Sequence, residues 1–533
     1  MINVRCRFTL RATPGDLHAG TYSGAPAGDK PMAFCSSPLR RTVIASLILL
    51  LFSAICTAQA PVASPGANQS QSMKGAVLKG KAPVAKEILK VQLPKADEAT
   101  LPNGLRVILL ENHRVPTFSA QMVFLNGGFA DPPDHRGMAS FTAALLREGT
   151  KKLNSREIAE QIDSLGASLS SGSGLSSLTT NVSASGLIEN IDAILGIFSS
   201  VVLEPTFPKD ELEKFKNRTL SQLQFQRSIP QFLAQERFNR SIYQDHPAGL
   251  VSPPIESVKK TTSEDLIRFH DRYYLPNNAL LAVVGDVTLK ELLPKIERLF
   301  GAWKTGDASE IPVSQALESG AEARIHLIDR PGSVQTVLML GNLGIRRTDP
   351  DYFNLLVADK LLGGGAASRL FLNLREDKSY TYGAYSYFGG SKFRGVWIAS
   401  SEVRTEVTAG ALQEFLAEFK RLREELVPAE ELANTKRSLV GSFALSLEEP
   451  QSLLGNILLQ KIYNLNSDYW DTFPQKVAAV TADDVRRVAQ KYLRLDRLQT
   501  VAVGDASKLR TVLANFGALA LYDMEGKEVP APK

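Results

Sequence analysis

Hydrophobic positions recur with two periods along the chain from about residue 98 onward. Two-residue alternation and short apolar runs predict strands, at residues 98–101, 105–110, 117–125, 167–174 and 177–184. Recurrence every three to four residues predicts amphipathic helices, at residues 137–150, 155–165, 188–203 and from Pro208 to about 224. Pro102-Asn103-Gly104 is typical of a hairpin turn between the first two strands. These elements together predict an α+β fold.

The pattern is repeated in the second part of the chain. At an offset of 219 residues, a helix, an apolar strand and a Gly-Asp pair align without gaps, from Asp265, Tyr273 and Gly285-Asp286 to Asp484, Tyr492 and Gly504-Asp505. At an offset of 220, a helix start aligns, from Pro208, Glu211, Leu212 and Lys216 to Pro428, Glu431, Leu432 and Lys436. Paired offsets of this kind indicate two homologous halves. We expect domains at 96–305 and 324–525, joined by a polar linker at 306–323.

The N-terminal region has the layout of an export signal. Arg40-Arg41 precede an apolar run at 43–54, and Ala58-Gln59-Ala60 supplies a small-x-small cleavage motif. This predicts a signal peptide within residues 1–60, followed by a flexible leader at 61–95 that is rich in Pro, Ala, Gly and Ser. We expect an exported, periplasmic or secreted protein, with no stable membrane span after cleavage. A lipid anchor at Cys56 is disfavoured by the bulky Ile55, and translation could start at Met1 or Met32.

Composition narrows the function classes. Of the 533 residues, 44% are hydrophobic and 22% charged, which is ordinary for a globular protein, and the net charge is only +5. Without a basic cluster interleaved with aromatic residues, nucleic-acid binding is not expected. Because all three cysteines lie within the first 60 residues, a disulfide framework or a cysteine-ligated metal is excluded for the main body.

Residues 137–150 read G-M-A-S-F-T-A-A-L-L-R-E-G-T. This stretch resembles the zinc helix of the insulinase/pitrilysin-type metallopeptidases, the inverzincins, whose signature is H-x-x-E-H. The matching positions are Gly137, Ala139, Phe141, Leu146, Gly149 and Thr150. The resemblance extends over about residues 98–519 and is nearest to the short-subunit branch that includes mitochondrial processing peptidase. It implies two α/β-sandwich halves, each an antiparallel sheet covered by helices, that form one side of a clamshell chamber.

The residues that would perform the chemistry are absent. Against that signature, Ser140 and Ala144 stand for the two histidines, and Ala143 for the glutamate that takes a proton from the zinc-bound water. On a later helix, Gln222 aligns with the glutamate that completes the metal site, although Glu211 and Glu213 lie nearby. No H-x-x-E-H or H-E-x-x-H occurs elsewhere in the sequence. The sequence therefore predicts that this chain binds no metal and is not active alone.

The second half retains a family motif. Ser368-Arg369-Leu370, Leu374-Arg375-Glu376 and Tyr380-Thr381-Tyr382 resemble a stretch whose arginine and tyrosine, seven residues apart, reach toward the substrate backbone in relatives. The resemblance implies that Arg375 and Tyr382 bind substrate, since arginine offers planar charged donors and tyrosine a hydroxyl for a developing oxyanion. A purely structural alternative pairs Arg375 with Glu376 or Asp377, and makes Tyr382 one ring of an aromatic strand.

The resemblance implies a non-catalytic, substrate-binding subunit of an exported heterodimeric zinc peptidase. Its partner would be a homologous subunit that carries H-x-x-E-H and the zinc, and its substrate a peptide. Two alternatives remain open: a scaffold protein that keeps the fold without a peptide role, and an active metallopeptidase with an atypical site. The peptide, the partner's identity and the oligomer size cannot be read from the sequence.

Overall fold

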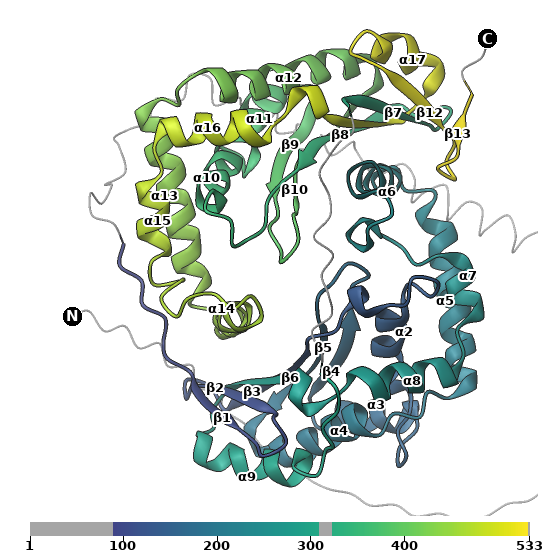
Figure 1. Ribbon diagram of the computed structural model, residues 1–533, viewed down its shortest axis with the longest axis vertical. Helices are drawn as coiled ribbons and strands as arrows, with labels where there is room; N and C mark the ends of the chain where they lie inside the picture. Colours follow the sequence, from purple (N-terminus) through teal and green to yellow (C-terminus); the bar gives the residue numbers. More distant parts are fainter. Residues whose placement is uncertain (1–88, 309–321, 531–533) are drawn as a thin grey trace, which may run out of the picture. The chain divides into compact units, whose positions relative to one another are not determined.

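The computed structural model describes residues 89–308 and 322–530, all within the compact unit Ala82–Lys533. Each half of the sequence contributes one mixed β-sheet flanked by helices (Figure 1). The predicted α+β fold with two homologous halves is confirmed. The predicted signal peptide, most of the leader and most of the linker lie outside the described residues.

The first sheet has the strand order β1-β2-β6-β3-β5-β4. Its strands are β1 (Asp97–Thr100), β2 (Arg106–Glu111), β3 (Thr117–Phe124), β4 (Ser168–Ser173), β5 (Thr180–Leu187) and β6 (Ala279–Gly285). All neighbours are antiparallel except β2 and β6, which are parallel. The predicted hairpin joins β1 to β2, with Gly104 at φ 85° in its turn. Glycine suits this position because it adopts positive φ without a steric cost.

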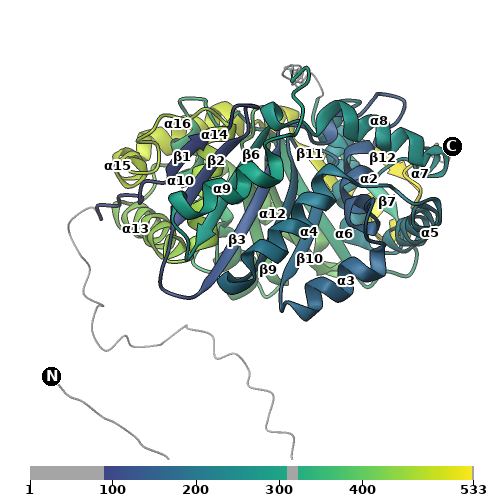
Figure 2. The same ribbon diagram turned by 90° about the horizontal axis from the view of Figure 1, so that it is seen from below.

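The helices of the first half pack mainly on one face of this sheet. They are α2 (Met138–Leu145), α3 (Ser155–Ser164), α4 (Ile191–Leu203), α5 (Lys209–Gln226), α6 (Pro230–Tyr243), α7 (Ile255–Lys260), α8 (Ser263–Tyr273) and α9 (Leu289–Phe300). Five 3₁₀ segments accompany them: η1 (Gly128–Ala130), η2 (Leu146–Glu148), η3 (Ile188–Asn190), η4 (Pro247–Gly249) and η5 (Pro276–Asn278). Figure 2 shows α4 and α9 lying across this outer face. The apolar residues of α4 and α9 share one core cluster with Val107, Met122 and Leu281 of the sheet.

The second sheet has the order β13-β12-β7-β11-β8-β10-β9. Its strands are β7 (Arg324–Asp329), β8 (Gln335–Leu343), β9 (Thr381–Phe388), β10 (Val396–Arg404), β11 (Gln499–Gly504), β12 (Leu519–Tyr522) and β13 (Glu528–Val529). The run β7-β11-β8-β10-β9 repeats β2-β6-β3-β5-β4 in order and direction, including the single parallel pair. β12 adds a parallel neighbour to β7. The predicted repeat is thus visible as a shared sheet topology.

The second half has its own set of helices. They are α10 (Tyr352–Gly363), α11 (Arg369–Phe371), α12 (Thr408–Glu424), α13 (Ala429–Ser446), α14 (Pro450–Ile462), α15 (Phe473–Ala479), α16 (Ala482–Tyr492) and α17 (Ala506–Ala514). The segment η6 (Leu372–Asp377) is a π-helix, and η7 (Thr405–Val407) and η8 (Leu495–Arg497) are 3₁₀ turns. No helix of the described part of the chain has the length and apolar character needed to cross a membrane.

Details of the backbone repeat as well. The capping box of α8, Thr262 with Asp265, recurs on α16 as Thr481 with Asp484. In each box the threonine hydroxyl accepts the aspartate N–H and the carboxylate accepts the threonine N–H, so both helices start in the same way. Gln244 and Asn464, 220 residues apart, have φ of 52° and 51°. Because side chains with Cβ rarely adopt positive φ, this coincidence supports a common origin of the two helix ends.

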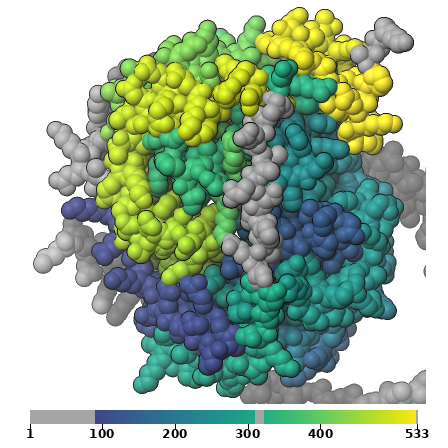
Figure 3. All heavy atoms as spheres, in the orientation of Figure 1, coloured from purple at the N-terminus to yellow at the C-terminus, as the bar shows by residue number. Residues whose placement is uncertain are grey.

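One helix of each half packs on the sheet of the other half. The apolar face of α6 lies on β8 and β11 of the second sheet, in a cluster with Val337, Met339 and Val501. Correspondingly, α14 lies on β6 of the first sheet, in a cluster with Ile108, Val123 and Leu280. Figure 3 shows the purple atoms of β1 and β2 against the yellow-green atoms of α14. This reciprocal crossing covers part of the second face of both sheets.

Candidate functional site

The helix that resembles the zinc helix is shorter than expected. Its α-helical part, α2, ends at Leu145, and residues 146–148 tighten into the 3₁₀ turn η2. Gly137, with φ 105°, is its N-cap. The buried carboxylate of Asp131 accepts the N–H groups of Gly137 (2.6 Å) and Ala139 (2.7 Å), which otherwise have no helical acceptor. Burial raises the pKa of Asp131 to about 6, against the effect of these two hydrogen bonds.

A cavity of about 500 Å³ lies beside α2. Ala144 of α2 and Gln222 of α5 both line it, together with residues of the loop 251–253. Ser140 is half-buried and Ala143 is fully buried. The rings of Phe141 and Phe215 meet edge-on at 5.7 Å and hold α2 against α5. The structure therefore brings Gln222 next to the zinc-helix frame.

The residues around this cavity do not fit a zinc ion. Ala144 has no donor atom, and the neutral amide of Gln222 is a weak ligand compared with a carboxylate. The nearby glutamates Glu211 and Glu213 do not line the cavity and instead bind Lys214 and Lys216.

Charge around the cavity also opposes a metal. Arg147 and Arg218 line it and repel a cation, and they outnumber the one carboxylate of the lining, Glu148, which accepts a hydrogen bond from Ser155. Within residues 89–308 and 322–530, no group of three His, Cys, Asp or Glu side chains could hold a metal ion.

Arg375 and Tyr382 lie on two consecutive elements of the second half. Arg375 is on the π-helix η6, which packs against β9, and Tyr382 is near the start of β9. The Arg375 guanidinium stacks over the ring of Phe371 at 4.8 Å and lies 3.6 Å from Glu376. That ion pair is solvent-exposed and contributes little to stability. π-helical turns are uncommon and frequently occur at functional sites.

Tyr382 is not packed within its strand, because 89% of it is exposed. Tyr385 and Tyr387 of the same strand are also exposed, while Ala384 and Ser386 between them are buried. Tyr385 and Tyr387 pair with Ser400 and Ile398 of β10, on the face that α6 covers further along the sheet. Three tyrosines thus mark the uncovered end of this face. Sequence reasoning missed Tyr385 and Tyr387, although their two-residue spacing was a usable signal.

Arg369 of the same motif has a structural role. Its guanidinium is buried and forms a bidentate ion pair with Glu431 of α13, at 2.8 and 2.9 Å. Such planar pairing fixes α11 against α13. Arg369 therefore supports the segment that leads to Arg375, which is itself 40% exposed.

Comparisons with known proteins agree with this geometry. The family model described as "Insulinase (Peptidase family M16)" matches residues 106–251, and the one described as "Peptidase M16 inactive domain" matches residues 260–439. A protein of Bacillus subtilis named "Uncharacterized zinc protease YmxG" is 26% identical, over 66% of this chain and 85% of its own length.

Two further relatives link the chain to peptidase subunits and domains. The alpha subunit of the mitochondrial-processing peptidase of Pongo abelii is 25% identical, over 77% of this chain and 82% of its own length. The crystal structure of a "peptidase M16 inactive domain" from Pseudomonas fluorescens is 29% identical with a TM-score of 0.70, covering 77% of this chain and 98% of that chain. With both halves matched and the metal-site residues replaced, the chain belongs to the insulinase (M16) peptidase family as a member without the family's catalytic motif.

Proposed function

We propose that this chain is the non-catalytic, peptide-binding subunit of an exported heterodimeric zinc peptidase. Its partner is a homologous M16 subunit that carries H-x-x-E-H and the zinc ion. Arg375 and Tyr382 contact the peptide near the partner's zinc, where the guanidinium holds a backbone carbonyl and the phenol stabilises the oxyanion.

The observation that carries this proposal is the contrast between the two motifs. The frame of α2 is kept while its ligand positions hold Ser140, Ala144 and Gln222, so a metal site has no means of forming. Tyr382 and Arg375 are both exposed, and the contacts of Arg375 are a stack over Phe371 and a long ion pair with Glu376. An exposed phenol on the edge strand β9 and an exposed guanidinium on the neighbouring π-helix η6 suit a substrate in a shared chamber. Similarity to a mitochondrial-processing peptidase alpha subunit gives further support.

The test is reconstitution with an M16 subunit that carries H-x-x-E-H and comes from the same organism. With a fluorogenic peptide library, we expect no cleavage by this chain alone, slow cleavage by the partner alone and rapid cleavage by the mixture. Arg375→Ala or Tyr382→Phe should lower kcat of the complex by about 100- to 1000-fold, the range for losing one oxyanion donor. Assembly, measured by analytical ultracentrifugation, and the partner's zinc content should not change.

Arg156→Ala is the matched control, because within the described residues this exposed arginine pairs only with Glu160 on the surface of α3. It should leave turnover unchanged. Full activity of a complex that carries both Arg375→Ala and Tyr382→Phe would refute the substrate role and favour a scaffold protein. Proteolysis by the purified chain without a partner would instead favour an atypical active site.

A further inference from the structure

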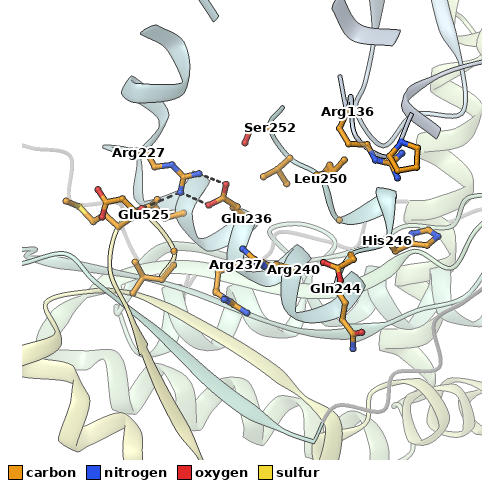
Figure 4. Close-up of a pocket in the computed structure, with 18 residues that line it drawn as sticks. Arg136, Arg227, Glu236, Arg237, Arg240, Gln244, His246, Leu250, Ser252 and Glu525 are labelled. Atoms are coloured by element: carbon orange, nitrogen blue, oxygen red, sulfur yellow. Dashed lines mark hydrogen bonds and ion pairs between the residues drawn. The ribbon is translucent and has the colours of Figure 1, made fainter. Parts of the chain in front are cut away.

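A second cavity, of about 650 Å³, lies against α6, beside the apolar cluster that packs this helix on the second sheet. Its walls come from α6, from residues 244–252 and from the loop 524–526 that joins β12 to β13 (Figure 4). This volume lies within the range of sites that enclose a small ligand or one end of a chain. No family motif or predicted site residue falls within it.

Two of the arginines that line the cavity are already occupied. Arg227 forms a bidentate ion pair with Glu236 and also donates to the carbonyl oxygen of Met524 (Figure 4). Arg136 donates to the carbonyl oxygen of Asp131 at 3.0 Å. These two side chains therefore shape the cavity walls, and they account for only part of its positive charge.

The other two arginines, Arg237 and Arg240, form no close ion pair in the described part of the chain, although the charge of Glu528 attracts Arg237. Arg237 stacks over the ring of Tyr522 at 4.2 Å, and its Nε is buried without a hydrogen-bond acceptor. Burial lowers the pKa of Arg237, and the positive charge of Arg240 nearby acts in the same direction. Asp245 and Glu525 line the cavity as well, but neither forms an ion pair with these arginines within the described residues. A half-buried guanidinium in this state gains stability from any anion that reaches it.

The repeat shows that the fold does not require these charges. Helix α14 follows the frame of α6, with Pro450-Gln451 for Pro230-Gln231 and Tyr463 for Tyr243. At the position of Arg237 it has the buried Ile457, and at the position of Arg240 it has Gln460. Both helices pack on a sheet in the same way, so an apolar residue satisfies the packing at this position. The arginines of α6 therefore require a reason other than packing.

Two residues connect this cavity with the one beside α2. Val251 and Ser252 line both, so the two cavities are neighbours. Leu233, Leu250 and Ile328 add apolar walls beside the arginines. A site of this composition suits a group with a hydrocarbon stem and an anionic planar end, which is the chemistry of a carboxylate on a peptide.

We propose that Arg237 and Arg240 bind the carboxylate of a bound peptide, from either an acidic side chain or the C-terminus. The inference deepens the proposed function and rests on it, because it supplies a specificity for acidic groups at a site where the peptide is held. Guanidinium groups match carboxylates with two parallel hydrogen bonds. Arg237 and Arg240 both line the cavity, and their guanidinium N–H groups other than the buried Nε of Arg237 provide the donors.

The test measures peptide binding to the purified full chain by fluorescence anisotropy. Four labelled probes share the stem Gly-Ser-Ala-Phe-Ala: one ends in amidated Glu, one in amidated Gln, one in Ala with a free carboxylate and one in amidated Ala. We expect the two carboxylate-free probes to bind at least about tenfold more weakly than their carboxylate-bearing counterparts. The Glu and free-end probes distinguish a side-chain carboxylate from a C-terminal one.

The combined variant Arg237→Ile and Arg240→Gln gives this chain the residues of α14. It should abolish the preference for carboxylates and leave the binding of amidated Gln unchanged, while Arg156→Gln on α3 should keep the preference. Equal binding of all four probes, or binding of inorganic phosphate with no peptide preference, would overturn the proposal. A complex that depends on Arg375 and Tyr382 yet ignores the α6 variant would overturn this inference alone and leave the proposed function intact.

Discussion

The two halves of this molecule share a sheet topology and differ at positions that face the cavities. Five strands follow the same order in both, the helix that crosses to the other sheet is present in both, and even the positive-φ residues Gln244 and Asn464 correspond. One difference is a polar side chain, Arg237, at the position where the other half has the buried, apolar Ile457. Packing constrains the apolar faces of both halves equally. Polar side chains that only one half carries therefore point to ligands.

The largest effect is expected when the first half receives the zinc-ligating residues of the family signature. Ser140→His, Ala144→His and Gln222→Glu together should create a zinc site, because Ala144 and Gln222 already line one cavity. We expect zinc affinity to increase from none at α2 to a micromolar or lower Kd, about 8 kcal/mol of binding free energy. Zinc content after dialysis against a weak chelator measures it.

Adding Arg218→Ala should strengthen that zinc site, because it removes a positive charge from the same cavity. The variant does not include Ala143→Glu, because the glutamate of the family signature at this position acts as a base and not as a zinc ligand. Position 143 is also fully buried. A folded triple variant that gains no zinc would show that α2 and α5 do not meet at ligand geometry.

The crossing helices can be weakened one at a time. Phe238 of α6 and Leu458 of α14 occupy corresponding positions, and both are buried against the sheet of the opposite half. Phe238→Ala should lower the free energy of unfolding by about 3–5 kcal/mol and Leu458→Ala by about 2–5 kcal/mol. Chemical denaturation followed by circular dichroism gives both values. Phe225→Ala, at a residue that is 60% exposed, should change stability by less than about 0.5 kcal/mol.

If only one of the two helix variants lost several kcal/mol of unfolding free energy, α6 and α14 would not contribute equally to stability. A change in denaturant dependence as well as midpoint would indicate that one half unfolds before the other.

Two aspartates that precede a helix, Asp131 before α2 in the first half and Asp351 before α10 in the second, should respond to pH in opposite directions. For Asp351, burial favours protonation, but hydrogen bonds from Arg487, Lys491 and Tyr492 outweigh it and hold the pKa well below its usual range. Its contribution is therefore present above pH about 4 and is lost as the pH falls. Asp131 has a pKa raised to about 6, so its contribution is present below pH about 4 and is lost as the pH rises through about 6.

Asp351→Asn should lower the free energy of unfolding by about 3 kcal/mol at pH 7, with a smaller loss below pH about 4. The free energy of unfolding of Asp131→Asn, relative to that of the parent protein, should be about 2–3 kcal/mol higher at pH 7 than at pH 4. Urea unfolding between pH 3 and 7 measures both. The same pH slope in both variants would contradict the opposite environments of the two carboxylates.

The smallest expected effect is a change in stability at the 650 Å³ cavity beside α6, called the anion cavity below. Arg237→Ile should change the free energy of unfolding by less than about 1 kcal/mol, because α14 packs with isoleucine at this position and the lost Nε has no acceptor. Thermal unfolding of the variant beside Arg156→Gln measures this. A loss of several kcal/mol of unfolding free energy would mean that the stacking of Arg237 on Tyr522 is structural. The exchange of Arg237 for Ile457 between α6 and α14 would then not point to a ligand.

Much of the fold could be predicted from the sequence because apolar periodicity and the repeat reflect local rules. The hairpin at Pro102-Asn103-Gly104 and the two halves followed from turn chemistry and offset. The sheet on which α6 and α14 each pack could not be predicted in this way. A helical stripe of apolar residues requires a partner surface but does not say which sheet supplies it. The second strand of the serine-rich pair begins later than expected, at Thr180, because Gly174 and Ser177 form a turn before it.

The candidate site was predictable only where a motif marked it. The replaced ligand positions and the Arg375 and Tyr382 pair could be proposed only from the resemblance to the family's motifs, because spacing alone favoured a structural role for the pair. The exposure of Tyr382 depends on which face of β9 the helices leave uncovered. The anion cavity combines segments almost 400 residues apart, from Pro133 to Gly526, which no local pattern connects. Extending the repeat from Pro230 to Pro450 would have shown the exchange of Arg237 for Ile457.

The reciprocal crossing of α6 and α14 has a consequence for biosynthesis. The ribosome completes α6 at Tyr243, but β11, one of the strands that covers its apolar face, begins at Gln499, about 250 residues later. At about 5–20 residues per second, the nascent chain therefore exposes Leu233, Phe238 and Ile242 for roughly 13–50 s. The apolar face of α6 stays incompletely covered until β11 is made, and the second face of the first sheet until α14 is made. The chain should therefore depend on a holding chaperone during translation, and truncated products should aggregate.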